Sequence, residues 1–402
     1  MRARRSYGEA VAGGVRLRAC LLGLAATCWA TGPSCVRSEP PSVPAAAPPA
    51  AAVPRTSQQA GPGHVIAYAS GYGPDIELFA VDAATGALSH TASFPSFGPA
   101  PSYLAFDPSV GHLYALDESP QGRVGAYRID PTTGSLTFVG AVSSGGDGPA
   151  HLSVDATGRH VLVANYGDGS VSVLPVLPDA QGGLGPPSQT LRVGAQAHMI
   201  ITDPSNRFAF VPCKGADYIA QFVFDATTGE LRPNQVAHVP TARGAGPRHL
   251  AFHPGGRFAY GINELDNTMT AYAFDPRAGT LSPIETQSTL PRGFAGKDTA
   301  AEVWVHPSGA WVFGSNRGDD SIVVFSVDPS SGRLTVKGHT KTGGATPRDF
   351  ALDATGSLLY VCNQGSGAVD PLRFDAERGV LTAAAPPVRV ASASFIGLVR
   401  LP

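Results

Sequence analysis

Short runs of alternating apolar and polar residues, separated by turn residues, recur along most of this chain. In residues 247–281, PRHLAFHPGGRFAYGINELDNTMTAYAFDPRAGTL, a first run leads to HPGGR. The runs FAYGIN and MTAYAFD follow, and the turn DPRAG precedes a fourth run. Alternation over a few residues between clusters of Gly, Pro and Asp is typical of β-strands. We therefore predict four consecutive antiparallel strands in this stretch.

The same unit occurs seven times at a nearly constant spacing. Its last turn has forms such as DATTGEL and ends at Leu88, Leu136, Leu184, Leu231, Leu281, Leu334 and Leu381. The intervals are 48, 48, 47, 50, 53 and 47 residues. Four antiparallel strands in each of seven repeats predict an all-β fold, a seven-bladed β-propeller. A solenoid also repeats, but its units are usually shorter and its ends need caps.

The two ends of the repeat region each hold part of one repeat. HVIAYASG, which starts at His64, begins in the middle of a unit, and SASFIGLVRL near the C-terminus supplies a missing first strand. Pairing between these two segments would remove the free edges that they otherwise leave. We therefore predict that N- and C-terminal strands close the ring of blades.

The first 63 residues differ in composition from the repeats. Several arginines precede the apolar run ACLLGLAATCWA, residues 19–30, and small residues follow it. This order is typical of an export signal, and the run is shorter than a membrane span. Cys28 and Cys35 are candidates for lipid attachment. The alternative interpretation is a start codon assigned too far upstream.

We predict three regions along the chain. They are an export signal, lipoprotein-type if a cysteine is lipidated, in residues 1–35, a disordered Ala/Pro-rich linker in residues 36–63, and the propeller in residues 64–402. The protein is then expected in the periplasm or cell envelope. A lipid anchor is its only expected contact with a membrane, and we expect a monomer.

Charge and motif content exclude several classes of function. The net charge is −2 and the repeats contain no run of Lys or Arg, so no nucleic-acid partner is predicted. The chain has no P-loop, GxSxG or HExxH motif. Its His, Asp and Glu residues lack metal-ligand spacing, and we predict neither a metal nor another cofactor. Cys213 and Cys362 lie three repeats apart and are expected to be unpaired, inert thiols.

Comparison of the repeats with one another separates scaffold from candidate site. A residue that recurs in every repeat serves the blade, whereas a polar position that differs in each repeat is a candidate for function. Aligned on the Asp/His-Pro turn, one variable position holds Ser102, Ala150, His198, Arg248, Ala301 and Arg348. The next position holds Tyr103, His151, Met199, His249, Glu302 and Asp349. A third, just after the second strand, holds Glu118, Tyr166, Lys214, Glu264, Arg317 and Gln364.

Strand register connects these positions. The first hairpin of the 247–281 unit turns near Gly255 and Gly256, so paired residues should have numbers that sum to about 512. Arg248 and Glu264 are then expected opposite each other at one end of the hairpin. Because the first strand of a propeller blade lines the central channel, the variable positions should surround one mouth of that channel. His253 and His306 replace the turn Asp and are expected to cap their turns.

Three consecutive repeats bring complementary chemistry to this mouth. His198 and Glu264 can each accept and return a proton. Arg248 and Arg317 can bind an anionic group and stabilise a developing oxyanion. This set suits hydrolysis of an anionic ester or lactone without a metal or covalent nucleophile. The alternative interpretation is structural, with an Arg248–Glu264 ion pair and satisfied buried histidines.

Two segments resemble a known family. GPRHLAFHPGGRFAYGINELDNTMTAY and AEVWVHPSGAWVFGSNRGDDSIVVF resemble the lactonase family of seven-bladed propellers, and the resemblance extends over residues 64–402. That family includes 6-phosphogluconolactonases and the fungal carboxy-muconate cycloisomerase. The resemblance implies that His198 and Glu264 are catalytic. It also implies that Arg248 and Arg317 hold the substrate, and we add His249 and Glu302 as expected substrate-binding residues.

The predicted function is hydrolysis of a sugar lactone in carbohydrate metabolism, of the 6-phosphogluconolactonase type. The partner would be a small anionic lactone or sugar acid, with Glu264 or His198 as the general base for water. A base role for His198 predicts a titration near neutral pH. Two alternatives remain at this point: an exported, non-catalytic propeller that binds a ligand or protein, and a muconate-type cycloisomerase.

Overall fold

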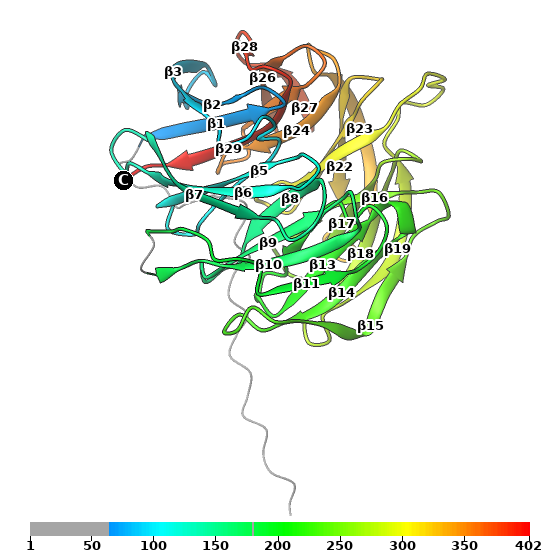
Figure 1. Cartoon of the computed structure of the whole chain (residues 1–402). Coiled ribbons are helices and arrows are strands. Elements are labelled where there is room, and N and C mark those ends of the chain that lie inside the picture. Colours follow the sequence, from blue (N-terminus) through cyan, green and yellow to red (C-terminus); the bar gives the residue numbers. More distant parts are fainter. Residues whose placement is uncertain (1–63, 179–180) are drawn as a thin grey trace, which may run out of the picture. The chain divides into compact units, whose positions relative to one another are not determined.

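A computed structural model describes residues 64–178 and 181–402 (Figure 1). The predicted export signal and linker, residues 1–35 and 36–63, lie outside this part of the chain. The described residues form seven antiparallel sheets, and these sheets are the blades of a β-propeller. The fold predicted from the repeats is confirmed. No helix in the described ranges is long and apolar enough to cross a membrane.

The blades are numbered here along the chain, and strands are given from the channel outward. Blade 1 consists of β4 (Leu104–Phe106), β5 (His112–Asp117), β6 (Arg123–Ile129) and β7 (Leu136–Ser143). Blade 2 consists of β8 (Pro149–Val154), β9 (His160–Asn165), β10 (Ser170–Pro175) and β11 (Gln189–Arg192). Blade 3 consists of β12 (Ile201–Thr202), β13 (Phe208–Cys213), β14 (Tyr218–Phe224) and β15 (Leu231–Pro240), with a 3-10 turn, η2 (Lys214–Ala216), after β13.

The remaining blades follow the same order. Blade 4 consists of β16 (Pro247–Phe252), β17 (Phe258–Asn263), β18 (Thr268–Asp275) and β19 (Thr280–Ser288). Blade 5 consists of β20 (Ala300–Val305), β21 (Trp311–Asn316), β22 (Ser321–Val327) and β23 (Leu334–Lys341). Blade 6 consists of β24 (Pro347–Leu352), β25 (Leu358–Asn363), β26 (Ala368–Asp375) and β27 (Val380–Ala383), and β28 (Val388–Arg389) also pairs with β26. Blade 7 consists of β29 (Ala393–Arg400), β1 (Val65–Gly71), β2 (Asp75–Val81) and β3 (Leu88–Pro95).

The last blade joins the two ends of the described chain. Strand β29 pairs antiparallel with β1, from Val65↔Arg400 to Gly71↔Ala393. In Figure 1 the red C-terminal strand lies beside the blue first strand. The predicted closure of the ring is therefore confirmed.

Neighbouring blades are held together by aromatic packing and by a repeated arginine contact. Phe210 of blade 3 packs edge-on against Phe252 of blade 4 at 5.3 Å between ring centroids. Burial of such a ring contributes roughly 1.5–3 kcal/mol. Arg207 donates a hydrogen bond of 2.6 Å to the carbonyl of Pro276 in the next blade. Equivalent contacts to a following blade are made by Arg159, Arg257 and Arg373.

The turn residues that recur in the repeats make local contacts, as their recurrence indicates. In the DATTGEL turn the Asp225 carboxylate accepts a 2.8 Å hydrogen bond from the Thr227 amide. Gly229 has φ of 79°, a conformation that favours glycine. The Nδ1 atoms of His253 and His306 accept the amides of Gly255 and Ser308, so the predicted capping role of both histidines is confirmed.

A β-bulge interrupts the channel-lining strand where the candidate residues lie. In blade 4 Pro247 pairs with Asn263, but His249 pairs with Ile262, so Arg248 has no counterpart on β17. Equivalent irregularities include Ala150, Ala301, Arg348 and Ser394. A bulge adds one unpaired residue and changes the direction of its side chain. In each affected blade the bulge changes the direction of one side chain near the start of the channel-lining strand.

The ring closure gives a first prediction. Deleting residues 393–402 should abolish cooperative unfolding, because β1 loses its partner and the apolar residues packed on β29 lose their blade. The measurement is thermal unfolding followed by circular dichroism. Removing only the exposed Pro402 is the control and should leave the transition in place. Cooperative unfolding of the longer deletion would contradict this role of β29.

Candidate functional site

One position in every blade places its residue at the same mouth of the channel. The amide after the second strand of the blade donates to a carbonyl just before the first strand, as in Glu264 to Gly246 at 2.7 Å. The seven residues at this position, here called the mouth ring, are Tyr72, Glu118, Tyr166, Lys214, Glu264, Arg317 and Gln364. Sequence comparison found six of them. It missed Tyr72 because the repeat of blade 7 is divided between the two ends of the chain.

Glu264 lies at the centre of a cluster of positive charges drawn from three consecutive blades. Its Oε1 is 2.8 Å from Lys214 Nζ, and its Oε2 is 3.3 Å from Arg248 Nε and 3.2 Å from Arg317 Nη2. The expected contact between Arg248 and Glu264 is present. The expected pairing of Arg248 with Glu264 is wrong, because paired numbers sum to 511 from His249 to Phe252 and to 510 at Pro247, so the bulge leaves Arg248 without a partner on β17.

Burial and charge act in opposite directions on Glu264. Burial alone would raise the pKa of this carboxyl, but Arg248, Arg317 and Lys214 together hold the pKa at about 2. Glu264 is therefore ionised throughout the neutral range. In this cluster Lys214, Arg248 and Arg317 face the carboxylates of Glu264 and Glu302, which leaves three positive charges against two negative ones.

Both arginines are fixed by backbone carbonyls. Arg248 Nη1 donates to Ala301 O at 2.7 Å, and Arg317 Nη2 donates to Ala300 O at 2.9 Å. Burial lowers the pKa of each, to about 10 for Arg317, so Arg317 remains charged at neutral pH. These contacts with carbonyls and carboxylates involve Nε and Nη1 of Arg248 and Nε and Nη2 of Arg317, and a guanidinium carries five N–H donors. Such donors can also serve an anion or an oxyanion.

His249 and Glu302 form a buried pair beside Arg248. Their side chains are each 1% exposed, and His249 Nδ1 lies 2.7 Å from Glu302 Oε2. The same Oε2 is 4.0 Å from Arg248 Nη1, and the Glu302 amide donates to Ser315 Oγ at 3.0 Å. The structure thus places these two predicted substrate-binding residues where they can orient Arg248.

His198 lies between the mouth ring and this buried pair. Its ring packs edge-on against Tyr166 and His249, at centroid distances of 5.5 and 5.1 Å. Its Nδ1 is buried and has no hydrogen-bond partner among the described residues. Burial, and then the charge of Arg248, holds the pKa of His198 well below 6.5. The expected titration of His198 near neutral pH is therefore corrected, because burial among positive charges disfavours the imidazolium.

Lys214 belongs to this site although the sequence did not single it out. Its side chain is 12% exposed and its ammonium lies 5.1 Å from the centroid of the Tyr166 ring. It occupies the same variable position as Glu264 and Arg317, and that was the available signal. The contact with Glu264 across a blade boundary became visible only in the folded ring.

Aromatic side chains and imidazoles separate the mouth from the rest of the channel. Tyr103 packs against His151 at 4.5 Å and against Phe395 at 4.7 Å between ring centroids. Beyond them a cavity of about 320 Å³ is lined mainly by apolar residues of the seven innermost strands, including Leu250, Trp304 and Phe395. The candidate site faces the opposite end of the channel.

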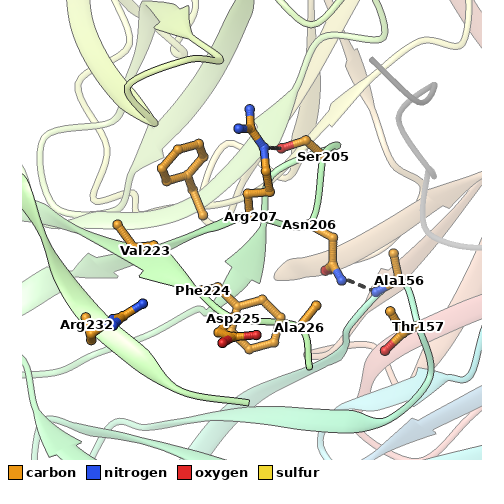
Figure 2. A pocket seen from close by; sticks show the side chains of 11 residues that line it. Ala156, Thr157, Ser205, Asn206, Arg207, Val223, Phe224, Asp225, Ala226 and Arg232 are labelled. Atoms are coloured by element: carbon orange, nitrogen blue, oxygen red, sulfur yellow. Dashed lines mark hydrogen bonds between the residues drawn. The ribbon is translucent and has the colours of Figure 1, made fainter. Parts of the chain in front are cut away.

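A second pocket, of about 560 Å³, lies at blades 2 and 3 and contains none of the candidate residues (Figure 2). Its polar groups are engaged in the scaffold. Asn206 binds the Ala156 amide and the Asp155 carboxylate, and Arg207 contacts Ser205 and Pro276.

Residues 64–178 and 181–402 contain no group of three or more His, Cys, Asp or Glu residues that could hold a metal ion. The unpaired thiols of Cys213 and Cys362 are buried, and burial raises their pKa values, that of Cys213 to about 12.

The lowered pKa of Glu264 has a consequence for stability. A carboxyl with pKa about 2 in the folded chain and 4.5 ordinarily stabilises the fold above pH 4.5 and loses that contribution as pH falls toward 2. Glu264→Gln should lower the free energy of unfolding at pH 7 by about 3 kcal/mol, because it leaves buried cations without their counter-charge.

Urea titrations between pH 7 and the acidic range measure the free energy of unfolding of the wild type and of Glu264→Gln. The difference in stability between these two proteins should shrink below pH 4.5. Glu230→Gln is the matched control, since Glu230 forms only an exposed 3.8 Å pair with Arg232. Glu230→Gln should lower the free energy of unfolding by less than about 1 kcal/mol. Equal losses of stability in the two variants would contradict the central role of Glu264.

Comparison with known proteins gives consistent matches. Residues 63–397 match the family described as "Lactonase, 7-bladed beta-propeller". A 6-phosphogluconolactonase of Bacillus subtilis is 34% identical over 327 residues, which cover 80% of this chain and 93% of that protein. One of Pectobacterium carotovorum is 37% identical over 224 residues, 56% of this chain, and the match covers 66% of that protein, just under two thirds.

A solved structure supports the same placement. The periplasmic gluconolactonase PpgL of Pseudomonas aeruginosa superposes with a TM-score of 0.76 at 31% identity, covering 85% of this chain and 99% of that one. The resemblance found from the sequence is confirmed. The chain belongs to the lactonase family of seven-bladed β-propellers.

Proposed function

We propose that this chain is a hydrolase that opens a sugar lactone to the corresponding hydroxy acid. The observation that carries the proposal is the mouth cluster, which brings the guanidinium groups of Arg248 and Arg317 to the same mouth as the uncharged imidazole of His198. The names of the relatives, 6-phosphogluconolactonase and gluconolactonase, support the same reaction class.

The reaction needs a base, an oxyanion site and a returning proton. His198 removes a proton from water as the water oxygen bonds to the lactone carbonyl carbon. N–H groups of Arg248 and Arg317 stabilise the negative charge that develops on the carbonyl oxygen. The bond from that carbon to the ring oxygen then breaks. The ring oxygen takes the proton from His198 and becomes a hydroxyl, while the new acid ionises to a carboxylate.

His198 suits the base role better than Glu264. Both oxygens of Glu264 contact cations, and a carboxylate with pKa about 2 is a weak base. His198 is neutral at pH 7 and so has a lone pair for the proton. Glu264 then acts by holding Lys214 and the two arginines in place. His249 and Glu302 act in turn as positioning residues for Arg248.

Two sugar lactones are the candidates for the substrate. 6-Phosphogluconolactone, with 6-phosphogluconate as product, follows from the names of the sequence relatives and from the surplus positive charge around Glu264. Unphosphorylated gluconolactone follows from the periplasmic gluconolactonase, which agrees with the export signal expected in residues 1–35. Both lactones undergo the same ring opening, and both belong to carbohydrate metabolism.

The direct experiment compares lactone opening by the purified chain with the spontaneous rate. We expect opening of at least one of the two lactones. His198→Gln should lower kcat by about 10²–10⁴, the usual contribution of a general base. Arg317→Gln should mainly reduce kcat/KM through loss of oxyanion stabilisation. Glu230→Gln is again the control.

Two results would contradict the proposal. A folded wild-type chain that opens neither lactone would favour an exported binding propeller instead. Unchanged turnover in His198→Gln would remove that residue from the chemistry.

The depressed pKa of His198 predicts the pH profile. Because the folded imidazole stays neutral as pH falls through 6.5, kcat/KM should remain flat there and decline only well below it. The measurement is initial rate against pH after subtraction of the spontaneous reaction. An inflection at 6.5 would show that a solvent-exposed histidine controls the rate.

A further inference from the structure

A second polar cluster lies on the other side of the mouth ring and is not used by the mechanism above. Arg348 Nη2 donates a 2.9 Å hydrogen bond to the Tyr72 hydroxyl, and its guanidinium lies 5.4 Å from the centroid of that ring. The Tyr72 hydroxyl in turn donates to Glu118 Oε2 at 2.6 Å. Glu118 Oε2 is 3.9 Å from Arg348 Nη2. The three residues therefore form a closed triangle of contacts.

This cluster belongs to the same mouth by topology. Tyr72 and Glu118 are mouth-ring residues of blades 7 and 1, and Arg348 occupies in blade 6 the bulge position that Arg248 occupies in blade 4. Blades 6, 7 and 1 continue the ring directly from blades 3, 4 and 5. The charge of Arg348 also acts on Arg248 and His198, whose pKa values it lowers together with burial.

The cluster is accessible to a ligand. Tyr72 is 36% exposed, and the side chains of Arg348 and Glu118 are 17% and 21% exposed. Burial raises the pKa of Tyr72, so its hydroxyl keeps the proton that it donates to Glu118. A donor and an acceptor of opposite charge are thus held next to each other at the mouth.

The two halves of the mouth carry different balances of charge. Lys214, Arg248 and Arg317 outnumber the carboxylates of Glu264 and Glu302 by one in blades 3 to 5. Arg348 is accompanied by Glu118, so positive and negative charge balance in the cluster of blades 6, 7 and 1. The half with positive charge favours the oxyanion and the carboxylate product. The other half has no surplus positive charge to attract an anion.

A sugar hydroxyl fits this second half, whereas a phosphate does not. A hydroxyl donates one hydrogen bond and accepts others, so it can donate to the Glu118 carboxylate and accept from Arg348. A phosphate group carries close to two negative charges at neutral pH and offers mainly acceptors. Beside Glu118 a phosphate would be repelled by a like charge and could donate no hydrogen bond to the carboxylate. Such a contact disfavours a phosphorylated ligand.

We propose that Tyr72, Glu118 and Arg348 form a specificity subsite that binds a hydroxyl of the lactone away from its carbonyl and discriminates against a phosphate there. The proposal rests on the proposed function and selects the unphosphorylated aldonolactone as the preferred substrate class. Glu118 is the discriminating residue, and Tyr72 and Arg348 hold it in position.

The test compares kcat/KM for gluconolactone and 6-phosphogluconolactone in the full chain. Wild-type protein should prefer the unphosphorylated lactone. In Glu118→Gln the ratio of phosphorylated to unphosphorylated kcat/KM should rise by about tenfold, mainly through KM, because the amide removes the charge and keeps the size. Glu377→Gln, which makes the same charge change in an exposed turn of blade 6, should leave both values unchanged.

Tyr72→Phe provides a second variant in case Glu118→Gln unfolds, which circular dichroism would show. Loss of the bridging hydroxyl should raise KM for gluconolactone severalfold. KM for the phosphorylated lactone should change less. An unchanged ratio in folded Glu118→Gln, or a wild-type preference for the phosphorylated lactone, would overturn the subsite while the hydrolase proposal stands. Opening of neither lactone by the wild type would overturn both.

Discussion

The antiparallel pairing of β29 with β1 is the constraint on which the rest of the molecule depends. Each blade presents one mouth residue, and a site forms only when seven blades hold these residues around a common channel. The ring fixes the positions of Lys214, Glu264 and Arg317, which come from three different blades and are separated by about fifty residues along the chain. Closure by the two ends of the chain therefore makes the local chemistry possible.

The charges at the mouth illustrate how a buried ionic cluster is maintained. Burial disfavours the charged forms of Glu264, Arg248 and Arg317, yet each of them is compensated by the others and by backbone carbonyls. Burial, and then the charge of Arg248, keeps His198 uncharged. Glu264 thus holds the arginines in place, and Arg248 adds to the effect of burial on the neighbouring imidazole. This arrangement links the stability of the mouth to its proposed chemistry.

The internal repeats made much of this accessible from one sequence. Residues that recur in every unit, such as Asp225 and Gly229, proved to be turn residues with local partners. Variable polar residues at equivalent positions proved to lie at one mouth. Three features escaped the comparison for physical reasons. The bulge at Arg248 has no signature in the alternation of apolar residues, Tyr72 lies in a repeat split between both ends, and the pKa of His198 depends on neighbours from other blades.

The sequence by itself determined the seven four-stranded blades, the closure by terminal strands and most of the positions that meet at the mouth. It could do so because strand alternation, turn residues and repeat spacing are local properties of the chain. Tertiary structure alone decided which of those residues touch, which are buried and which are charged. It placed Glu264 among three cations, Glu302 against His249, and Arg348 over Tyr72. These outcomes depend on distances between blades and on exclusion of water, which no single repeat contains.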